Sequence, residues 1–147
     1  MVQLVLPNDA NTMGNVLGGR VLHWIDLAAA IVAHRHCRTE AVTASMDQVS
    51  FHAPIRVGQL AVITARMTFV GRTSMEIRVD VQSEDLLSGA REQTSTAYLT
   101  FVAVDAKGRP VAVPPLRFET KEEQKEARAA EARRAGRLQG RPDLVAR

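Results

Sequence analysis

The sequence predicts an α+β fold in which one antiparallel sheet curls around one long apolar helix. Two observations lead to this prediction. Residues 20–38 have apolar side chains at helical spacing, and most of the chain from there to residue 104 has the composition of β-strands. Short connections join these strands, which favours antiparallel neighbours. A chain of 147 residues can bury one core, so we expect a single domain.

The amino-terminal elements are a short strand, a polar loop and the central helix. Residues 1–7 predict the strand, and residues 7–19 form a loop rich in asparagine, aspartate and glycine. The helix extends from Arg20 to about Arg38. Its broad apolar side consists of Val21, Leu22, Ile25, Ala29 and Val32.

Four extended segments follow the helix, at residues 41–54, 59–70, 75–81 and 94–104. In the first, the alternation of apolar residues changes phase between Met46 and Val49, so we expect a β-bulge near Asp47. Residues 75–81 alternate cleanly, which predicts one buried face and one face in water.

The carboxyl-terminal part is expected to be separate from this domain. Residues 105–108 predict a turn, and the prolines of residues 110–115 interrupt regular structure. A polar helix is expected from residue 119 to about residue 138. We therefore divide the chain into a domain at 1–118 and a C-terminal helix with a basic tail at 119–147.

The predicted sheet has a consequence for the oligomeric state of the protein. A single curved sheet leaves an edge strand with unpaired backbone N–H and C=O groups. Pairing of that edge with a second copy would satisfy these groups. We therefore expect a homodimer at minimum.

Composition argues against several classes of function. The surplus of three Lys and Arg over Asp and Glu lies entirely from Arg117 onward. Charges there are mixed in sign, and aromatic residues make up 4% of the chain, so we expect a solvated helix and no nucleic-acid binding. No apolar run reaches the ~20 residues that a membrane span requires. The first residues do not resemble a signal peptide.

Cysteine and histidine usage points to a reducing compartment without metal chemistry. Cys37 is the only cysteine, which precludes an internal disulfide and favours a cytoplasmic location. His34 and His36 lie two positions apart on the predicted helix and therefore point away from each other. We expect no metal site.

Asp26 is the most informative residue of the predicted helix. Leu22 lies four residues before it and Ala30 four residues after, so its carboxylate lies on the apolar side. A carboxylate is costly there unless it has a partner or a function. Gly18 and Gly19 precede the helix, where unpaired N–H groups and the helix dipole favour negative charge. This arrangement suits chemistry at a carbonyl, but a buried acid paired to a backbone group explains Asp26 equally well.

Six motifs in order, with a proline segment after them, resemble the hotdog-fold acyl-CoA thioesterases, in the group of cytoplasmic acyl-CoA hydrolases. They are Asn11-x-x-Gly14-Asn-x-x-Gly18-Gly19, Leu22-x-Trp24-Ile25-Asp26, Val42-Thr43-Ala-Ser-Met-Asp47, Phe51-x-x-Pro54-Ile55-x-x-Gly58, Gly71-Arg72-Thr73-Ser74-Met75, Thr100-Phe-Val-Ala-Val-Asp105 and the segment around Pro114. Together they cover Pro7 to about Pro115. Leu17 stands where many members have histidine, which we interpret as a change in pocket lining.

The resemblance implies a fold, an activity and an assembly. The fold is a long central helix wrapped by a curved antiparallel sheet of about five strands, here with an added C-terminal helix. The activity is hydrolysis of acyl-CoA to free acid and CoA, without metal or redox cofactor, in a dimer that often forms a trimer of dimers, a hexamer. A non-catalytic acyl-CoA-binding hotdog protein and a hotdog hydratase or dehydratase are the alternatives. The latter generally use a His–acid pair, and no histidine lies in the motif loop.

The resemblance also implies catalytic residues. Asp26 would be the general base or nucleophile, and Asn11 from the partner subunit would orient water or donate to the carbonyl oxygen. The backbone N–H of Gly19 would polarise the thioester carbonyl. Thr43 would place a hydroxyl near the nucleophilic water. Asn11 also suits a turn, and Thr43 suits any strand.

The implied coenzyme A contacts lie between the second and third extended segments, at residues 72–74. Arg72, Thr73 and Ser74 would lie beside the CoA moiety, where a guanidinium and two hydroxyls suit phosphate and amide groups. An ordinary hairpin turn explains them as well. Arg56 is a further candidate for the nucleotide phosphates, as are Arg133 and Arg134 in the tail.

Overall fold

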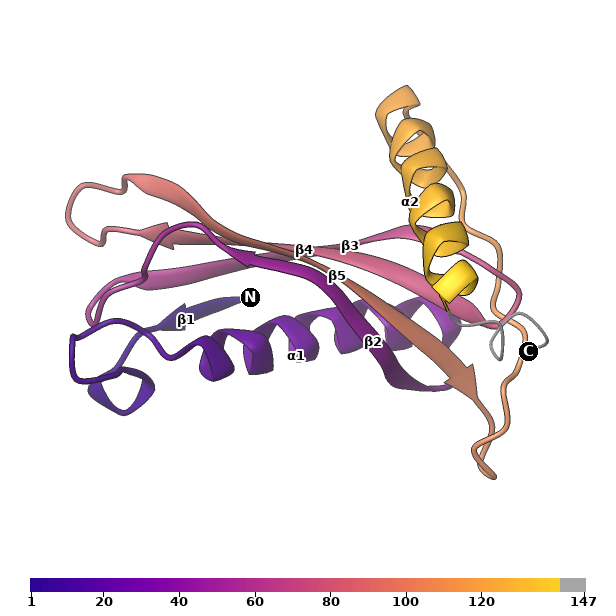
Figure 1. Cartoon of the computed structure of the whole chain (residues 1–147), viewed down its shortest axis with the longest axis horizontal. Coiled ribbons are helices and arrows are strands. Elements are labelled where there is room, and N and C mark those ends of the chain that lie inside the picture. Colours follow the sequence, from indigo (N-terminus) through magenta and orange to yellow (C-terminus); the bar gives the residue numbers. More distant parts are fainter. Residues whose placement is uncertain (141–147) are drawn as a thin grey trace.

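The computed structural model describes residues 1–140 and has the predicted α+β architecture, with a curled sheet around one helix (Figure 1). The elements in chain order are strand β1 (Val2–Leu4), 3-10 helix η1 (Pro7–Asp9), helix α1 (Gly18–Cys37), strands β2 (Glu40–Phe51), β3 (Leu60–Val70), β4 (Ser74–Glu84) and β5 (Arg91–Val104), and helix α2 (Lys121–Gly140). All the predicted helices and strands are present. The expected basic tail continues into residues 141–147, which lie outside the described residues.

The five strands form one antiparallel sheet in the order β1-β3-β4-β5-β2. The prediction that short connections join neighbours is correct for β3, β4 and β5. It is wrong for β2 and β3, which lie on opposite sides of the β4–β5 pair. The reason is that the segment between them passes the start of α1, where the Val16 N–H donates to the Ile55 carbonyl at 2.7 Å.

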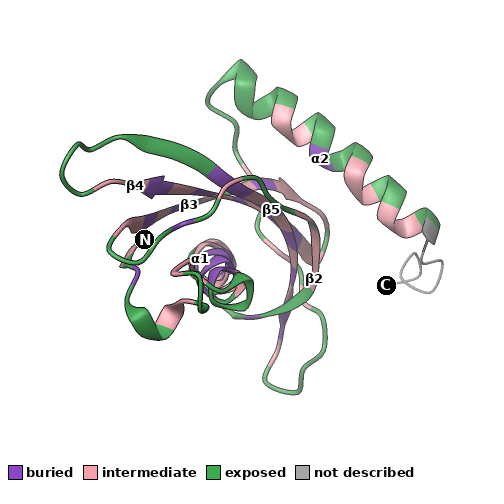
Figure 2. Cartoon of the chain, turned by 60° about the vertical axis from the view of Figure 1, so that its left-hand side comes forward, coloured by how far each residue is buried: buried purple, intermediate pink, exposed green. Residues whose placement is uncertain are grey.

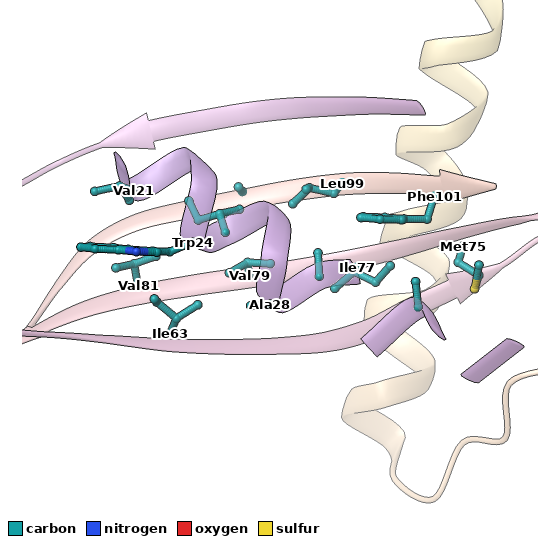
Figure 3. Close-up of a cluster of buried hydrophobic side chains, with 14 of the residues drawn as sticks. Val21, Trp24, Ala28, Ile63, Met75, Ile77, Val79, Val81, Leu99 and Phe101 are labelled. Atoms are coloured by element: carbon teal, nitrogen blue, oxygen red, sulfur yellow. The ribbon is translucent and has the colours of Figure 1, made fainter. Parts of the chain in front are cut away.

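Helix α1 packs into the concave face of the sheet and forms the core with it. Its buried residues are Val21, Trp24, Ile25, Ala28, Ala29, Ala33 and Cys37. They contact the inward-facing residues of the sheet, among them Ile63, Ile77, Val79, Val81, Leu99 and Phe101 (Figure 3). The three buried alanines let the sheet backbone approach the helix closely. Burial of these side chains is the main stabilisation of the fold.

Strand β2 is the edge strand on one side of the sheet and has the predicted irregularity. Its register against β5 shifts between Asp47 and Ser50, which confirms the expected bulge, and also between Thr43 and Ser45. In the described chain its second edge pairs with no strand. Val42 on this strand is half exposed.

Helix α2 lies on the convex face of the sheet, opposite α1 (Figure 2). Ala130 is its one fully buried residue in the described part. The face of β4 that was predicted to face water is therefore partly covered, and Glu76 on it is only 1% exposed. No described helix is both long and apolar enough to span a membrane.

Candidate active site

Asp26 lies in the third turn of α1, at the margin of its buried side. The residue is half buried, and the Thr43 hydroxyl on β2 donates to its Oδ1 at 2.8 Å. Within residues 1–140 no protein group donates to Oδ2. Pairing to a backbone group, the alternative explanation of Asp26, is therefore not observed. The structure brings together two of the predicted site residues, one oriented by the other.

Asn11 lies in the loop before α1, and its side chain has one occupied end and one open end. Its Oδ1 accepts the backbone N–H groups of Met13 at 2.9 Å and Asn15 at 3.1 Å. These two donors fix the orientation of the amide, because only an oxygen can accept them. Among the described residues the Nδ2 group has no acceptor. The geometry is therefore compatible with both the turn role and the predicted functional role of this side chain.

The Asn11 loop is held by an ion pair that sequence reasoning missed. Arg20 Nε lies 3.1 Å from Asp9 Oδ1, and the Asp9 carbonyl accepts the Leu17 N–H at 2.8 Å. A second contact ties the Leu6 N–H to Asp9 Oδ2 at 2.9 Å. In the sequence, the indication was an acidic residue in the loop and a basic residue in the first helical turn. The loop brings these two side chains together.

The start of α1 presents free backbone donors. Leu17 is the N-cap residue, and it provides no side-chain hydrogen bond to the first turn. A Cβ added at Gly19 would meet no atom within 4 Å, so the space beside its α-carbon is open. Beside this terminus is a cavity of about 290 Å³, lined by Val16, Gly18, Val21, Phe51, His52, Ala53, Pro54, Ile55 and Ser95.

Asp26 and the helix start lie too far apart to act together within one protomer. Asp26 follows Gly18 by eight residues, which corresponds to about 12 Å along the helix axis. The expected arrangement of a carboxylate beside the glycine-flanked terminus is therefore not formed inside a single chain. One thioester carbonyl could contact both groups only if they came from different subunits.

The predicted coenzyme A turn lies at the Asp26 end of the sheet. The Gly71 N–H donates to the Ser74 carbonyl at 2.9 Å, and the Arg72 carbonyl accepts the Val113 N–H at 2.8 Å. In the sheet register Phe101 pairs with both Thr43 and Met75, so the start of β4 is two strands, about 10 Å, from Thr43. Arg72 is exposed, whereas the hydroxyl side chains of the turn are half buried.

The remaining predicted cations lie elsewhere. Arg56 is exposed and forms a β-bridge with Asn15, at the opposite end of α1 from the coenzyme A turn. Arg133 is engaged on the convex face of the sheet, where it pairs with Glu76 at 2.7 Å. It is therefore not free to bind a phosphate. Arg134 lies beside Gly71, with its Nε 3.6 Å from the position that a Cβ would take there.

The histidines of α1 make local contacts. His36 Nε2 donates to the Pro114 carbonyl at 2.7 Å, and His34 Nδ1 donates to the Ala30 carbonyl at 2.8 Å. In the part of the chain that the structure describes, no cluster of three or more His, Cys, Asp or Glu could hold a metal ion.

Comparison with known proteins defines the class. The sequence profile of the thioesterase superfamily matches residues 13–90, and the chain belongs to this family. Within it the chain groups with acyl-CoA thioester hydrolases. The uncharacterized acyl-CoA thioester hydrolase YkhA of Bacillus subtilis is 46% identical over 119 residues, covering 81% of this chain and 69% of that protein. The rat cytosolic acyl coenzyme A thioester hydrolase is 40% identical over 127 residues; the match covers 85% of this chain but only 33% of that protein.

Solved structures confirm the predicted hotdog fold. An apo hexameric acyl-CoA thioesterase has a TM-score of 0.91 at 42% identity, covering 95% of this chain and 89% of that one. The acyl-CoA hydrolase of Staphylococcus aureus, in complex with butyryl-CoA, CoA and CoA disulfide, has a TM-score of 0.86 at 32% identity, covering 99% and 91%. Alanine variants of that enzyme have been solved at an aspartate, at a threonine 17 residues after it and at an asparagine 15 residues before it.

Proposed function

We propose that this protein hydrolyses acyl-CoA thioesters to free acid and CoA, at a site that two subunits share. The observation that carries the proposal is the contact between Thr43 and Asp26, in which the Thr43 hydroxyl holds one oxygen of a half-buried carboxylate. Among the described residues the other oxygen accepts no hydrogen bond, and the outer edge of β2 beside it pairs with no strand. Family membership supplies the substrate class. We place the protein in the cytoplasm, in agreement with the name of the rat relative, which describes that enzyme as cytosolic.

The spacing of three residues supports their roles. Asn11 precedes Asp26 by 15 residues and Thr43 follows it by 17, the same intervals that separate the three substituted residues of the Staphylococcus enzyme. Equal spacing across a chain of the same fold supports equivalent positions for the three side chains. This correspondence favours an active enzyme over a protein that only binds acyl-CoA.

Pairing of two β2 strands would build the composite site. Within one protomer Thr43 lies beside Asp26, and the Phe51 ring lies 3.8 Å from the position that a Cβ would take on Gly18. These two contacts are at opposite ends of β2. If two copies pair antiparallel about Asp47, the Thr43 end of one strand lies opposite the Phe51 end of the other. Asp26 then meets the helix start and the Asn11 loop of the partner.

Exposed apolar side chains support pairing at this edge. Leu27 and Ile31 on α1 are 43% and 48% exposed, and Val42 on β2 is 51% exposed. All three lie on the elements that border the unpaired edge, and an isolated chain would leave them in water. Three such dimers would form a hexamer, the assembly named for the apo thioesterase that this chain resembles.

In the proposed reaction, Asp26 acts on the thioester carbonyl carbon through its open Oδ2. As a general base it takes a proton from water, the water oxygen bonds to the carbon, the C–S bond breaks, and the proton passes to the leaving thiolate. As a nucleophile its carboxylate oxygen bonds to the acyl carbon, the C–S bond breaks, and CoA leaves as the thiolate. Water then hydrolyses the anhydride to the free acid and the Asp26 carboxylate, and the proton released passes to the thiolate. In both routes the Asn11 Nδ2 group and the Gly19 N–H donate to the developing oxyanion. Thr43 keeps the carboxylate in position.

The coenzyme A moiety would extend from this carbonyl to the turn at 71–74. Arg72 offers an exposed guanidinium to phosphate, and Thr73 and Ser74 offer hydroxyls to the pantetheine amides. Arg56 would come from the subunit that supplies Asn11, because it lies in the same region as that loop. No cofactor takes part in this scheme.

Two experiments test the proposal. Thiol release from a panel of acyl-CoAs should be measurable for the wild type and lost by orders of magnitude in Asp26→Ala, which should still bind CoA. A wild type that binds acyl-CoA without releasing thiol would leave only the binding function. A purified heterodimer of Asn11→Asp and Asp26→Ala protomers has one intact shared site and should recover about half of the wild-type activity. An inactive heterodimer would refute the shared site.

A further inference from the structure

Glu76 is a buried carboxylate that has no role in the proposed catalytic mechanism. It lies on the convex face of β4, two residues after the coenzyme A turn, and is 1% exposed. Arg133 of α2 donates to both of its oxygens, at 2.7 Å and 3.1 Å, and Arg137 donates to Oε2 at 3.2 Å. The Thr68 hydroxyl donates to Oε1 at 2.6 Å. A charge this deeply buried is stable only with such complete pairing.

Charged contacts dominate the attachment of α2 to the sheet. Arg66 on β3 donates to Glu126 at 3.1 Å, and the Arg133 guanidinium lies 3.9 Å from the centre of the Tyr98 ring. Arg137 also approaches Asp47 on β2 at 3.6 Å. Because few apolar residues of α2 are buried, ion pairs and hydrogen bonds determine the position of this helix on the sheet. The bidentate pair of Arg133 and Glu76 is the most buried of them.

The docked helix is joined to the coenzyme A turn at two points. Arg134, adjacent to the buried pair, packs beside Gly71, and its guanidinium lies 6.0 Å from the centre of the Phe69 ring. The segment that leads from β5 to α2 crosses the same turn, where the Val113 N–H donates to the Arg72 carbonyl at 2.8 Å. A shift of α2 would therefore move the backbone on which Arg72 and its neighbours are carried.

We propose that Glu76 and Arg133 are positioning residues for coenzyme A binding, acting through the docked α2 on the turn at 71–74. This inference rests on the proposed function only for the identity of the ligand. The pair contacts no substrate atom; it fixes a helix, and the helix fixes the turn. The pair lies on the convex face of the sheet, whereas Asp26 lies on α1 in the concave face, so breaking the pair is expected to lower affinity and not turnover.

The test measures binding of CoA itself and hydrolysis of acyl-CoA in the full-length protein. Arg133→Met keeps the length of the side chain but removes the ion pair, and Arg133→Met/Arg137→Met removes every α2 donor to Glu76. We expect the calorimetric Kd for CoA and the KM for acyl-CoA to rise about five- to twentyfold, with kcat within about twofold. Hydrogen exchange at the Gly71 and Val113 amides should accelerate in the same variants.

Two further variants separate positioning from general effects. Lys125→Met removes a cation from α2 at an exposed position that forms no ion pair or hydrogen bond with the sheet within residues 1–140, and it should leave the Kd unchanged. Arg133→Lys restores the charge but not the bidentate geometry and should recover part of the affinity. An unchanged Kd in both Arg133→Met and the double variant would overturn the inference. An inactive wild type whose CoA affinity still depends on Arg133 would instead overturn the proposed activity alone.

Discussion

Asn11→Asp separates the proposed catalytic role of Asn11 from its structural role. The structural role belongs to Oδ1, which accepts two backbone N–H groups at 2.9 and 3.1 Å. Aspartate retains an oxygen at that position, so the loop should keep its turn. The proposed catalytic role belongs to Nδ2, which aspartate lacks. The substitution therefore removes one donor to the oxyanion and leaves the fold unchanged.

The expected magnitude follows from the chemistry of that donor. Loss of a preorganised oxyanion donor typically costs about 3 kcal/mol of barrier, a decrease of 10²–10³ in kcat. Asn11→Ala removes the donor and the turn acceptor together, so its kcat should fall equally. Its free energy of unfolding should fall by a further amount of about 1 kcal/mol.

The assay is thiol release under single-turnover conditions, with thermal unfolding of both variants in parallel. Thermal midpoints should be near the wild-type value for Asn11→Asp and lower for Asn11→Ala. If Asn11→Asp retained the full rate while Asn11→Ala lost it, the side chain would act only as a turn former. The donor role derived from the hydrogen-bond geometry would then be wrong.

Three other perturbations have definite expected outcomes. Thr43→Val should lower kcat about tenfold, because a hydrogen bond to a charged acceptor contributes about 1.5 kcal/mol. Thr43→Ser keeps the hydroxyl and should have a kcat near that of the wild type. Equal kcat values for the two variants would show that Thr43 does not position Asp26. Leu99→Ala, at a fully buried position, should lower the free energy of unfolding by about 2–5 kcal/mol in chemical denaturation. Burial alone would raise the pKa of Glu76, but hydrogen bonds from Arg133 and Thr68, with the charge of Arg133, hold this pKa below its usual value of 4.5. Its contribution to stability is therefore complete above that pH and lost as the pH falls through the lower folded-state pKa, and Glu76→Gln should flatten the acid limb of the unfolding curve.

Local periodicity predicted the elements well, because each helix and strand is defined by which side chains it buries. The bulge near Asp47 was visible in the sequence as a change of phase in the alternation of apolar residues. Strand order was harder. Nothing in the alternation of β2 indicates that it pairs with β5 and not with β3. That choice depends on the path of the loop past the helix start.

The site was predicted as a set of residues and not as an arrangement. Asp26 and Gly19 were placed together from their chemistry, although the rise of an α-helix separates them by about two turns. Glu76 was missed for a different reason. It belongs to an alternating strand whose polar side was expected to face water, and the cations that cover it lie 57 and 61 residues later. Such a pair has no local signature.

The missing side-chain cap at Leu17 has a consequence for anyone who would engineer this protein. An aspartate or serine there would satisfy the first helical N–H groups and stabilise α1 by about 1 kcal/mol. In the proposed site, the same group would compete with the acyl oxygen for the Gly19 N–H. A screen for stabilising substitutions would therefore rank this change highly, yet the resulting variant would be stable and inactive. The uncapped helix start lowers stability, but in the proposed site it is the position that the substrate occupies.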